Sequence, residues 1–244
     1  MRVAALYDVH GNRPALEAVL ADRRCAGADL IVCGGDLVAG PEPAECLDRL
    51  EAEGDRVRFL SGNGDRETVS PPAEGQLAEV GRWAAARLGA KRLERVAQWP
   101  LTVELDIDGL GRTLFCHATP RSDTDILTAI TPDENVASAI EGVGAEVVVC
   151  GHTHVQYDRQ VAGVRVVNAG SVGMPYEGSP DARWALLGDG EMALVATAYD
   201  AEGALAELTA TGFPGLDEWF GSVVRREVTA EEATSIFERR RRGA

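Results

Sequence analysis

Residues 3–12 read VAALYDVHGN, and residues 30–36 read LIVCGGD. Each stretch is a short apolar run, typical of a buried strand, that leads directly into a polar, Gly-containing loop. Between them, residues 13–24 carry Leu16, Val19 and Leu20 at helical spacing, with Pro14 tolerated in the first turn. Strand and helix alternating in this way predict parallel strands joined by right-handed crossovers, and therefore an α/β fold.

Three polar side chains follow the first three predicted strands. Asp8 comes after the strand at 3–7, Asp36 after the strand at 30–33, and Asn63 after the strand at 57–60. In parallel sheets, functional loops gather beyond the carboxyl ends of the strands. We therefore expect these three side chains to share a site.

The rest of the chain predicts further helices, hairpins and no second domain. Residues 66–78 are polar and Pro-rich and predict an irregular excursion over the surface. Helices are expected at 44–50, 76–98, 132–140, 202–211 and from 229 to 239–242. The helices at 132 and 229 begin at Thr-x-x-Glu capping boxes. Strands are expected at 101–107, 113–116, 147–150, 157–161, 164–167, 184–187 and 192–198. Because no repeat or linker interrupts the pattern, we expect a single domain over residues 1–244.

The charge balance restricts the partners. The chain has 24 Lys and Arg against 39 Asp and Glu, a formal net charge of −15. Such a surface repels phosphate backbones, so binding of nucleic-acid polymers or anionic membranes is disfavoured. The first apolar run is too short for a signal peptide, and no stretch is long enough to span a bilayer, so we expect a cytoplasmic protein.

The five cysteines predict buried thiols. They are odd in number and lack Cys-x-x-Cys spacing, and Cys33, Cys116 and Cys150 each end an apolar run. This placement favours reduced strand residues over a disulfide framework or a structural zinc site.

All four histidines lie in short motifs with Asp, Asn and Gly. In chain order, the motifs are Asp8-Val9-His10, Gly35-Asp36, Gly62-Asn63-Gly64-Asp65, Cys116-His117 and Gly151-His152-Thr153-His154. Any one buried His is more often a core residue than a ligand. Imidazole and carboxylate are nevertheless the natural nitrogen and oxygen ligands of metals, and the five motifs together indicate a metal centre.

The order of these motifs resembles that of the calcineurin-like metallophosphoesterases. The opening 8–12 and the later Asn168-Ala169-Gly170-Ser171-Val172-Gly173 are similar to the small bacterial, phosphodiesterase-like branch. The resemblance covers about residues 3–198 and implies a four-layer α/β/β/α sandwich of two mixed sheets. Residues from about 200 to 244 are then a helical extension of that core.

The resemblance implies two metal sites that share one carboxylate. The first site would be Asp8, His10, Asp36 and His154, and the second Asp36, Asn63, His117 and His152. Oxygen ligands mixed with imidazoles suit transition metals better than Mg²⁺ or Ca²⁺. We expect two divalent ions, Mn before Fe, Zn or Ni, with His10, Asn63, Asp65 and His117 as the catalytic residues.

The implied activity is hydrolysis of phosphodiesters or small phosphomonoesters by in-line attack of a hydroxide that bridges the two ions. A small phosphate ester is then the partner, and a homo-oligomer is possible. Two alternatives stay open: a protein Ser/Thr phosphatase and a non-catalytic metal-binding interaction scaffold. The filled ligand positions favour the enzyme over the scaffold.

One position departs from the family pattern. Many members have a His between the Asn and the Asp of the third motif, where it helps to protonate the leaving group; here the residue is Gly64. We therefore expect a preference for esters with good leaving groups. For Arg66 a surface ion pair is favoured over a phosphate contact, for Asn12 a turn role, and for Tyr176 and Trp184 plain packing over a substrate pocket.

Overall fold

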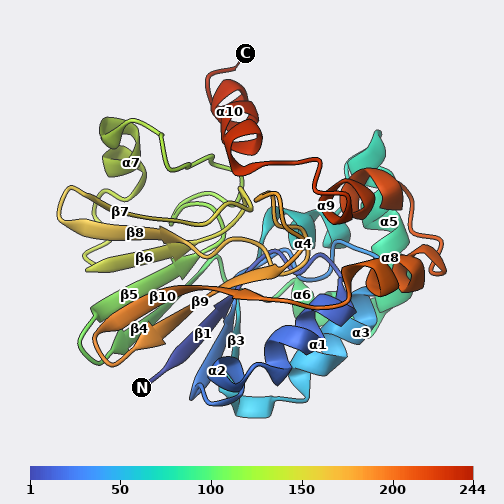
Figure 1. The fold of residues 1–244 in the computed structure, drawn as a ribbon, viewed down its shortest axis with the longest axis horizontal. Coiled ribbons are helices and arrows are strands. Elements are labelled where there is room, and N and C mark those ends of the chain that lie inside the picture. Colours follow the sequence, from blue (N-terminus) through green and yellow to red (C-terminus); the bar gives the residue numbers. More distant parts are fainter. Residues whose placement is uncertain (244) are drawn as a thin grey trace.

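The computed structural model describes residues 1–243, which form two five-stranded sheets packed face to face between helices (Figure 1). The first sheet has the order β10-β9-β1-β2-β3, with β1 (Val3–Leu6), β2 (Leu30–Cys33), β3 (Val57–Phe59), β9 (Ala182–Gly188) and β10 (Glu191–Thr197). The second has the order β4-β5-β6-β8-β7, with β4 (Thr102–Ile107), β5 (Gly111–Cys116), β6 (Val147–Cys150), β7 (Tyr157–Val161) and β8 (Val164–Asn168). The predicted α/β class with two mixed sheets is confirmed.

Both sheets are mixed: the second has a parallel centre and two antiparallel edges, whereas the first is parallel from β1 to the edge strand β3 and antiparallel only on the β9–β10 side. Strand β1 pairs in parallel with β2, and β2 with β3, while β5, β6 and β8 are parallel in the second sheet. The sequence suggested a parallel half followed by a hairpin half. Instead, the β9–β10 hairpin returns to the first sheet, where β9 pairs with β1 and is largely buried.

Three apolar clusters define four layers. Tyr7, Val32, Phe115 and Leu187 belong to the cluster between the two sheets. The outer face of the first sheet packs against α1 (Arg13–Ala21) and α3 (Pro43–Glu51), and that of the second sheet against α7 (Asp133–Ala139). Each fully buried large apolar side chain contributes about 1.5–3 kcal/mol, so these layers fix the positions of the strand ends.

Two predicted helices are each broken once. After α1, Asp22 adopts an extended conformation and accepts a hydrogen bond from the Arg24 amide, which begins the short helix α2 (Arg23–Ala26). The helix predicted at 76–98 is divided into α5 (Gln76–Leu88) and α6 (Ala90–Val96) by Gly89, whose φ of 71° is left-handed.

Part of the predicted excursion at 66–78 is helical, so that prediction was wrong at its start. Helix α4 (Asn63–Val69) begins directly at the third motif. The Asp65 carboxylate accepts the Gly62 amide at 3.0 Å and so satisfies a donor at the helix start, a signal hidden within the motif.

The C-terminal residues add helices beside the site. A turn η1 (Gly54–Arg56) precedes β3, and α8 (Ala201–Thr209), the π-helical turn η2 (Asp217–Gly221), α9 (Ser222–Val224) and α10 (Ala230–Arg241) end the chain. Phe213 and Phe220 pack this region against Val80 of α5, whereas α10 projects at the top of Figure 1.

The two capping boxes have different outcomes. At α10, Thr229 and Glu232 exchange the predicted bonds. At α7, the Thr131 hydroxyl bonds the Thr128 amide and Glu238 instead, so that helix has no side-chain cap and the predicted box was wrong.

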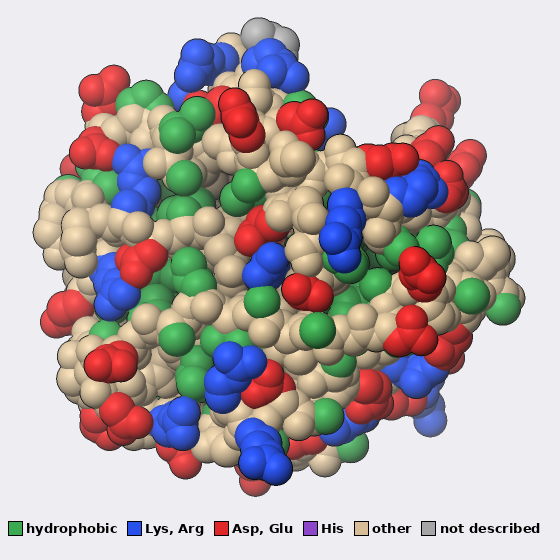
Figure 2. Space-filling model, in the orientation of Figure 1, with side chains coloured by type: hydrophobic (Ala, Val, Ile, Leu, Met, Phe, Trp, Pro, Cys, Tyr) green, Lys and Arg blue, Asp and Glu red, His purple; other side chains and the backbone are tan. Residues whose placement is uncertain are grey.

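The charged surface and the buried cysteines agree with what the sequence predicts. Acidic and basic side chains are interspersed over the face in Figure 2. All five cysteines are free and buried, as predicted for reduced core residues. Among the described residues, no helix has the length and apolar character that crossing a membrane requires.

Candidate metal centre

The seven predicted metal ligands gather where the carboxyl ends of the two sheets meet. Asp8 and Asp36 follow β1 and β2, Asn63 starts α4 after β3, His117 follows β5, and His152 and His154 follow β6. The Asp36 Oδ2 atom lies 3.7 Å from His10 Nε2 and 3.6 Å from His117 Nε2, between the two predicted groups of ligands. Asp8, His10 and His154 form one cluster able to hold a metal, and Asp8, Asp36 and His117 form another.

The backbone at these positions is strained. Five of the predicted ligands have φ values of 49–65°, a left-handed region that is uncommon for residues other than glycine: Asp8, His10, Asp36, His152 and His154. Each such residue costs about 1–3 kcal/mol, which the surrounding structure must offset. Strain concentrated on one set of polar side chains indicates a functional site.

Three of the imidazoles are oriented by backbone carbonyl groups. The Nδ1 atoms lie 3.1 Å from the Ala39 oxygen for His10, 3.0 Å from the Gly34 oxygen for His117 and 2.8 Å from the Met174 oxygen for His154. A neutral imidazole that donates from Nδ1 has a lone pair on Nε2. This orientation presents Nε2 to the centre, as is usual for metal-binding histidines.

The inward-facing atoms are acceptors that lack donors. His10 Nε2 and His154 Nε2 are 3.2 Å apart, and Asp8 Oδ1 is buried without a hydrogen-bond partner. One terminal amide atom of Asn63 lies 3.0 Å from His152 Nδ1 and 3.3 Å from His117 Nε2. The Asn63 NH₂ group faces these two imidazoles when no cation is bound, and the oxygen would have to turn to this side to act as a ligand. At His10, His154 and Asp8, lone pairs converge without a donor, and a cation is the group that completes such an arrangement. The donor set therefore fits divalent transition metals.

The electrostatics favour the ligand forms of most of these groups. Burial lowers the pKa of His10, and burial together with the His117 charge lowers the pKa of His152 to about 4. Burial opposes ionisation of Asp8, but the charges of His154 and His117 outweigh it and hold the pKa of Asp8 below its usual range. For His117, burial is outweighed by Asp36 and Asp8, which raise its pKa. Metal binding requires neutral imidazoles and ionised carboxylates.

Asp65 holds the loop that carries Asp36. Its carboxylate accepts the amides of Asp36 at 2.7 Å, Leu37 and Val38 at 3.0 Å, and Gly62 at 3.0 Å. Burial and the Asp36 charge raise the pKa of Asp65 to about 7, so the group is ionised above neutral pH. Both oxygens face backbone amides, which makes Asp65 a positioning residue rather than one that contacts a substrate.

The glycines of the motifs lie where side chains do not fit. A Cβ atom on Gly151 would lie 2.4 Å from Asp8 Oδ2, and one on Gly64 would lie 2.7 Å from the Ala39 Cβ. The Gly64 amide instead donates to Asp36 Oδ1 at 2.6 Å. The position at which other family members have His is thus closed by Ala39 here.

Most of the weaker candidates are structural. Arg66 pairs with Asp123 at 2.6 Å, and Asn12 caps α1 through the Ala15 amide, as favoured from the sequence. Trp184 is fully buried in the core. The Tyr176 ring, for which packing was favoured, stacks on His154 with centroids 4.7 Å apart and so borders the centre.

Several residues of the site had no sequence signal. Trp219 and Phe237, from the C-terminal helices, lie beside the imidazoles of the centre. Two others belong to the 168–173 motif, which the sequence showed without a role for either. The Ser171 hydroxyl donates to the Asp8 carbonyl at 2.8 Å, and the Asn168 amide donates to the Gly151 carbonyl at 2.6 Å. An aromatic residue in a short C-terminal helix has no local pattern that distinguishes it from a core residue.

Comparison with known proteins agrees with this geometry. The sequence profile of the calcineurin-like phosphoesterase superfamily domain matches residues 1–188. The protein MJ0912 of Methanocaldococcus jannaschii is 26% identical over 243 residues, covering 90% of this chain and 95% of that protein. The crystal structure of a metallophosphoesterase from Sphaerobacter thermophilus superposes with a TM-score of 0.73 at 25% identity, covering 92% of this chain and 99% of the other. The hypothetical protein PH1004 from Pyrococcus horikoshii OT3 shares the fold with a TM-score of 0.77 at 19% identity, covering 91% and 97%.

Proposed function

The chain belongs to the calcineurin-like phosphoesterase superfamily and is a phosphoric ester hydrolase, and we propose that it is a dinuclear enzyme acting on phosphodiesters or small phosphomonoesters. The observation that carries the proposal is the convergence of partnerless acceptors. His10 and His154 bring their Nε2 atoms to 3.2 Å, next to the unpaired Asp8 Oδ1 atom.

We assign the ligands to two ions that share Asp36, although the two three-residue clusters in the structure have Asp8 in common. Asp8, His10, Asp36 and His154 would hold one ion, and Asp36, Asn63, His117 and His152 the other. Mn is the preferred metal, with Fe, Zn or Ni as alternatives. Two divalent cations held by these residues would supply an activated water and positive charge for the phosphoryl oxygens.

The remaining residues orient the substrate and the loops. Asn63 is only half-buried, so its amide can donate a hydrogen bond to a phosphoryl oxygen as charge develops there. The Nδ1 atoms of His10 and His117 lie within hydrogen-bond distance of backbone carbonyl oxygens, which directs both Nε2 atoms towards the centre. Asp65 keeps Asp36 in position through the loop amides.

The substrate class follows from charge and from the missing acid. A chain with a net charge of −15 disfavours polymeric nucleic acid, and it also disfavours phosphoproteins with acidic surfaces. Because Gly64 supplies no proton to the leaving group, esters with good leaving groups, such as aryl or nucleotide esters, are preferred.

The test is hydrolysis of bis(p-nitrophenyl) phosphate and of p-nitrophenyl phosphate by metal-free protein reconstituted with Mn²⁺. Turnover should require the metal and should be lost in His152→Ala. The control is Glu231→Gln, which changes an exposed side chain on α10. A His152→Ala variant as active as the wild type, or a chain that binds two Mn²⁺ and hydrolyses neither ester, would contradict the proposal.

A further inference from the structure

The cavity beside the centre is too small for a phosphate ester. Its volume is about 40 Å³, and its lining includes His10, Asp36, Asn63 and Trp219. Because a cavity needs about 10–15 Å³ of this volume to hold one water, the space admits a few water molecules and no ester. Something in the surroundings must therefore move before an ester binds.

Two C-terminal aromatic rings lie beside the imidazoles of the centre: Trp219, which also lines this cavity, and Phe237, which lies outside it. The Trp219 ring meets His10 edge-on, with centroids 5.8 Å apart. The Phe237 ring lies 6.3 Å from His152 and 6.5 Å from Tyr176. His152 and Asn63 are the predicted ligands that keep partial exposure, so Phe237 lies at the open side of the centre.

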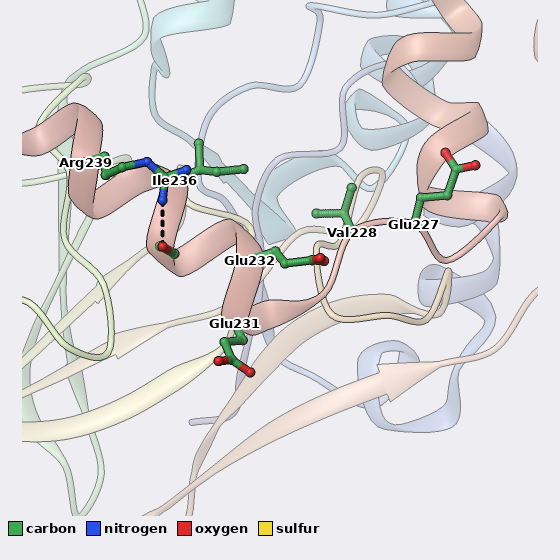
Figure 3. Close-up of a pocket in the computed structure, with 7 residues that line it drawn as sticks. Glu227, Val228, Glu231, Glu232, Ile236 and Arg239 are labelled. Atoms are coloured by element: carbon green, nitrogen blue, oxygen red, sulfur yellow. Dashed lines mark hydrogen bonds between the residues drawn. The ribbon is translucent and has the colours of Figure 1, made fainter. Parts of the chain in front are cut away.

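Helix α10, which carries Phe237, is weakly packed. Of its twelve residues, only Ala233 and Glu238 are buried, and Ile236 is 40% exposed. A groove of about 490 Å³ runs along one side, with Ile236 and Val228 on opposite sides of it (Figure 3). A second groove of about 600 Å³ separates α10 from Ile130 and neighbouring residues. Elements with so few buried apolar contacts open at low free-energy cost.

The Glu238 carboxylate hydrogen-bonds α10 to the loop before α7. Glu238 accepts hydrogen bonds from the hydroxyls of Thr128 and Thr131, which precede α7. Its other oxygen accepts from Arg241 of the same helix. The tie therefore depends on two threonine hydroxyls.

The same helix brings positive charge to the open side. The Arg240 guanidinium lies 5.8 Å from the Phe237 ring and has no acidic partner within 4 Å among residues 1–243. In a chain of net charge −15, this position favours the approach of an anion.

We propose that α10 (Ala230–Arg241) forms a cover over the open side of the metal centre, joined to the packed residues before it by 225–229, and that Phe237 controls which phosphate esters reach the centre. The proposal rests on the proposed function, because it takes the centre to be metal-bound. Opening separates Phe237 from His152 and breaks the bonds between Glu238 and the two threonines. The ring then limits the size of the organic group that the centre admits, so it disfavours diesters relative to monoesters.

The test is the rate at which Mn²⁺-loaded full-length protein loses metal to excess EDTA. Phe237→Ala and Glu238→Ala should each accelerate the loss by about tenfold, because a hydrogen-bonded charged group or a covering ring is removed. Thr128→Val weakens the same tie from the opposite side and should act in the same direction. The matched controls on α10 are Ile236→Ala, which faces a groove, and Glu231→Ala, which is exposed; both should leave the rate unchanged.

If all five variants lose Mn²⁺ at the same rate, the proposed cover is wrong. The proposed function is unaffected by that result, because the protein still binds Mn²⁺ at the start of the experiment. A chain that binds no Mn²⁺ would overturn both. A second readout is the ratio of kcat/KM for bis(p-nitrophenyl) phosphate to that for p-nitrophenyl phosphate. Phe237→Ala should raise this ratio by about tenfold, and an unchanged ratio would remove Phe237 as the specificity residue.

Discussion

Asp65→Asn should destabilise the protein although it changes one atom. The carboxylate accepts four backbone amides, two on each oxygen. Asparagine keeps one oxygen but presents an NH₂ group to the other two amides, which are then buried without an acceptor. At about 2 kcal/mol for each amide, the free energy of unfolding falls by about 4 kcal/mol. For a chain of this length, that corresponds to a fall in Tm of about 8–16 °C.

The assay is thermal unfolding of metal-free protein at pH 8, where Asp65 is ionised because its pKa is raised to about 7. Asp106→Asn is the matched control, since that side chain is exposed on β4 and its change should alter stability by less than about 0.5 kcal/mol. The variant should also bind Mn²⁺ more weakly, because the loop that carries Asp36 loses at least one of its three bonds to this side chain. A Tm equal to that of the control would refute the role assigned to Asp65.

Three further predictions follow from the structure. Gly64→His alone should lower Tm, because its Cβ would lie 2.7 Å from that of Ala39. Gly64→His combined with Ala39→Gly should fold and should accelerate hydrolysis of esters with poor leaving groups by about 10²-fold. If the rate of the double variant depends on the leaving group as that of the wild type does, the missing acid is not what limits hydrolysis. Burial raises the pKa of Cys25 and Cys150 to about 12, so a thiol reagent at pH 8 should label neither in the folded protein, and the stability present below about pH 9 should be lost as pH rises towards 12; labelling of the native protein would contradict this. Because the Trp219 ring lies 5.8 Å from that of His10, Mn²⁺ should quench its fluorescence and Trp219→Phe should show weaker quenching; a variant that keeps all of the quenching would place the metal elsewhere.

The part of the site on the first sheet could be predicted from local pattern. Asp8, Asp36 and Asn63 follow short apolar runs separated by a helical period, and parallel strands bring their carboxyl ends to one edge. The motifs of His117 and His152 indicated metal binding by composition, but their assignment to one site with Asp36 and Asn63 came only from the resemblance. Their strands belong to a second sheet, and no local period tells how two sheets meet.

The misses have physical causes. Helix α4 was not predicted because its start lies inside a Gly-rich motif, where the Asp65 side chain satisfies the amide of Gly62. The capping box predicted at Thr131 does not form, because the Thr131 hydroxyl donates its hydrogen bond to Glu238, 107 positions away. Phe237 could not be placed beside the centre from the sequence, since its position depends on the same long-range contact.

The most direct test of a two-metal centre is anomalous scattering from crystals of the Mn²⁺-loaded protein. We predict two peaks on either side of the Asp36 carboxylate, one next to His10 and His154 and the other next to His117 and His152. A single peak, or peaks away from these side chains, would contradict the dinuclear centre.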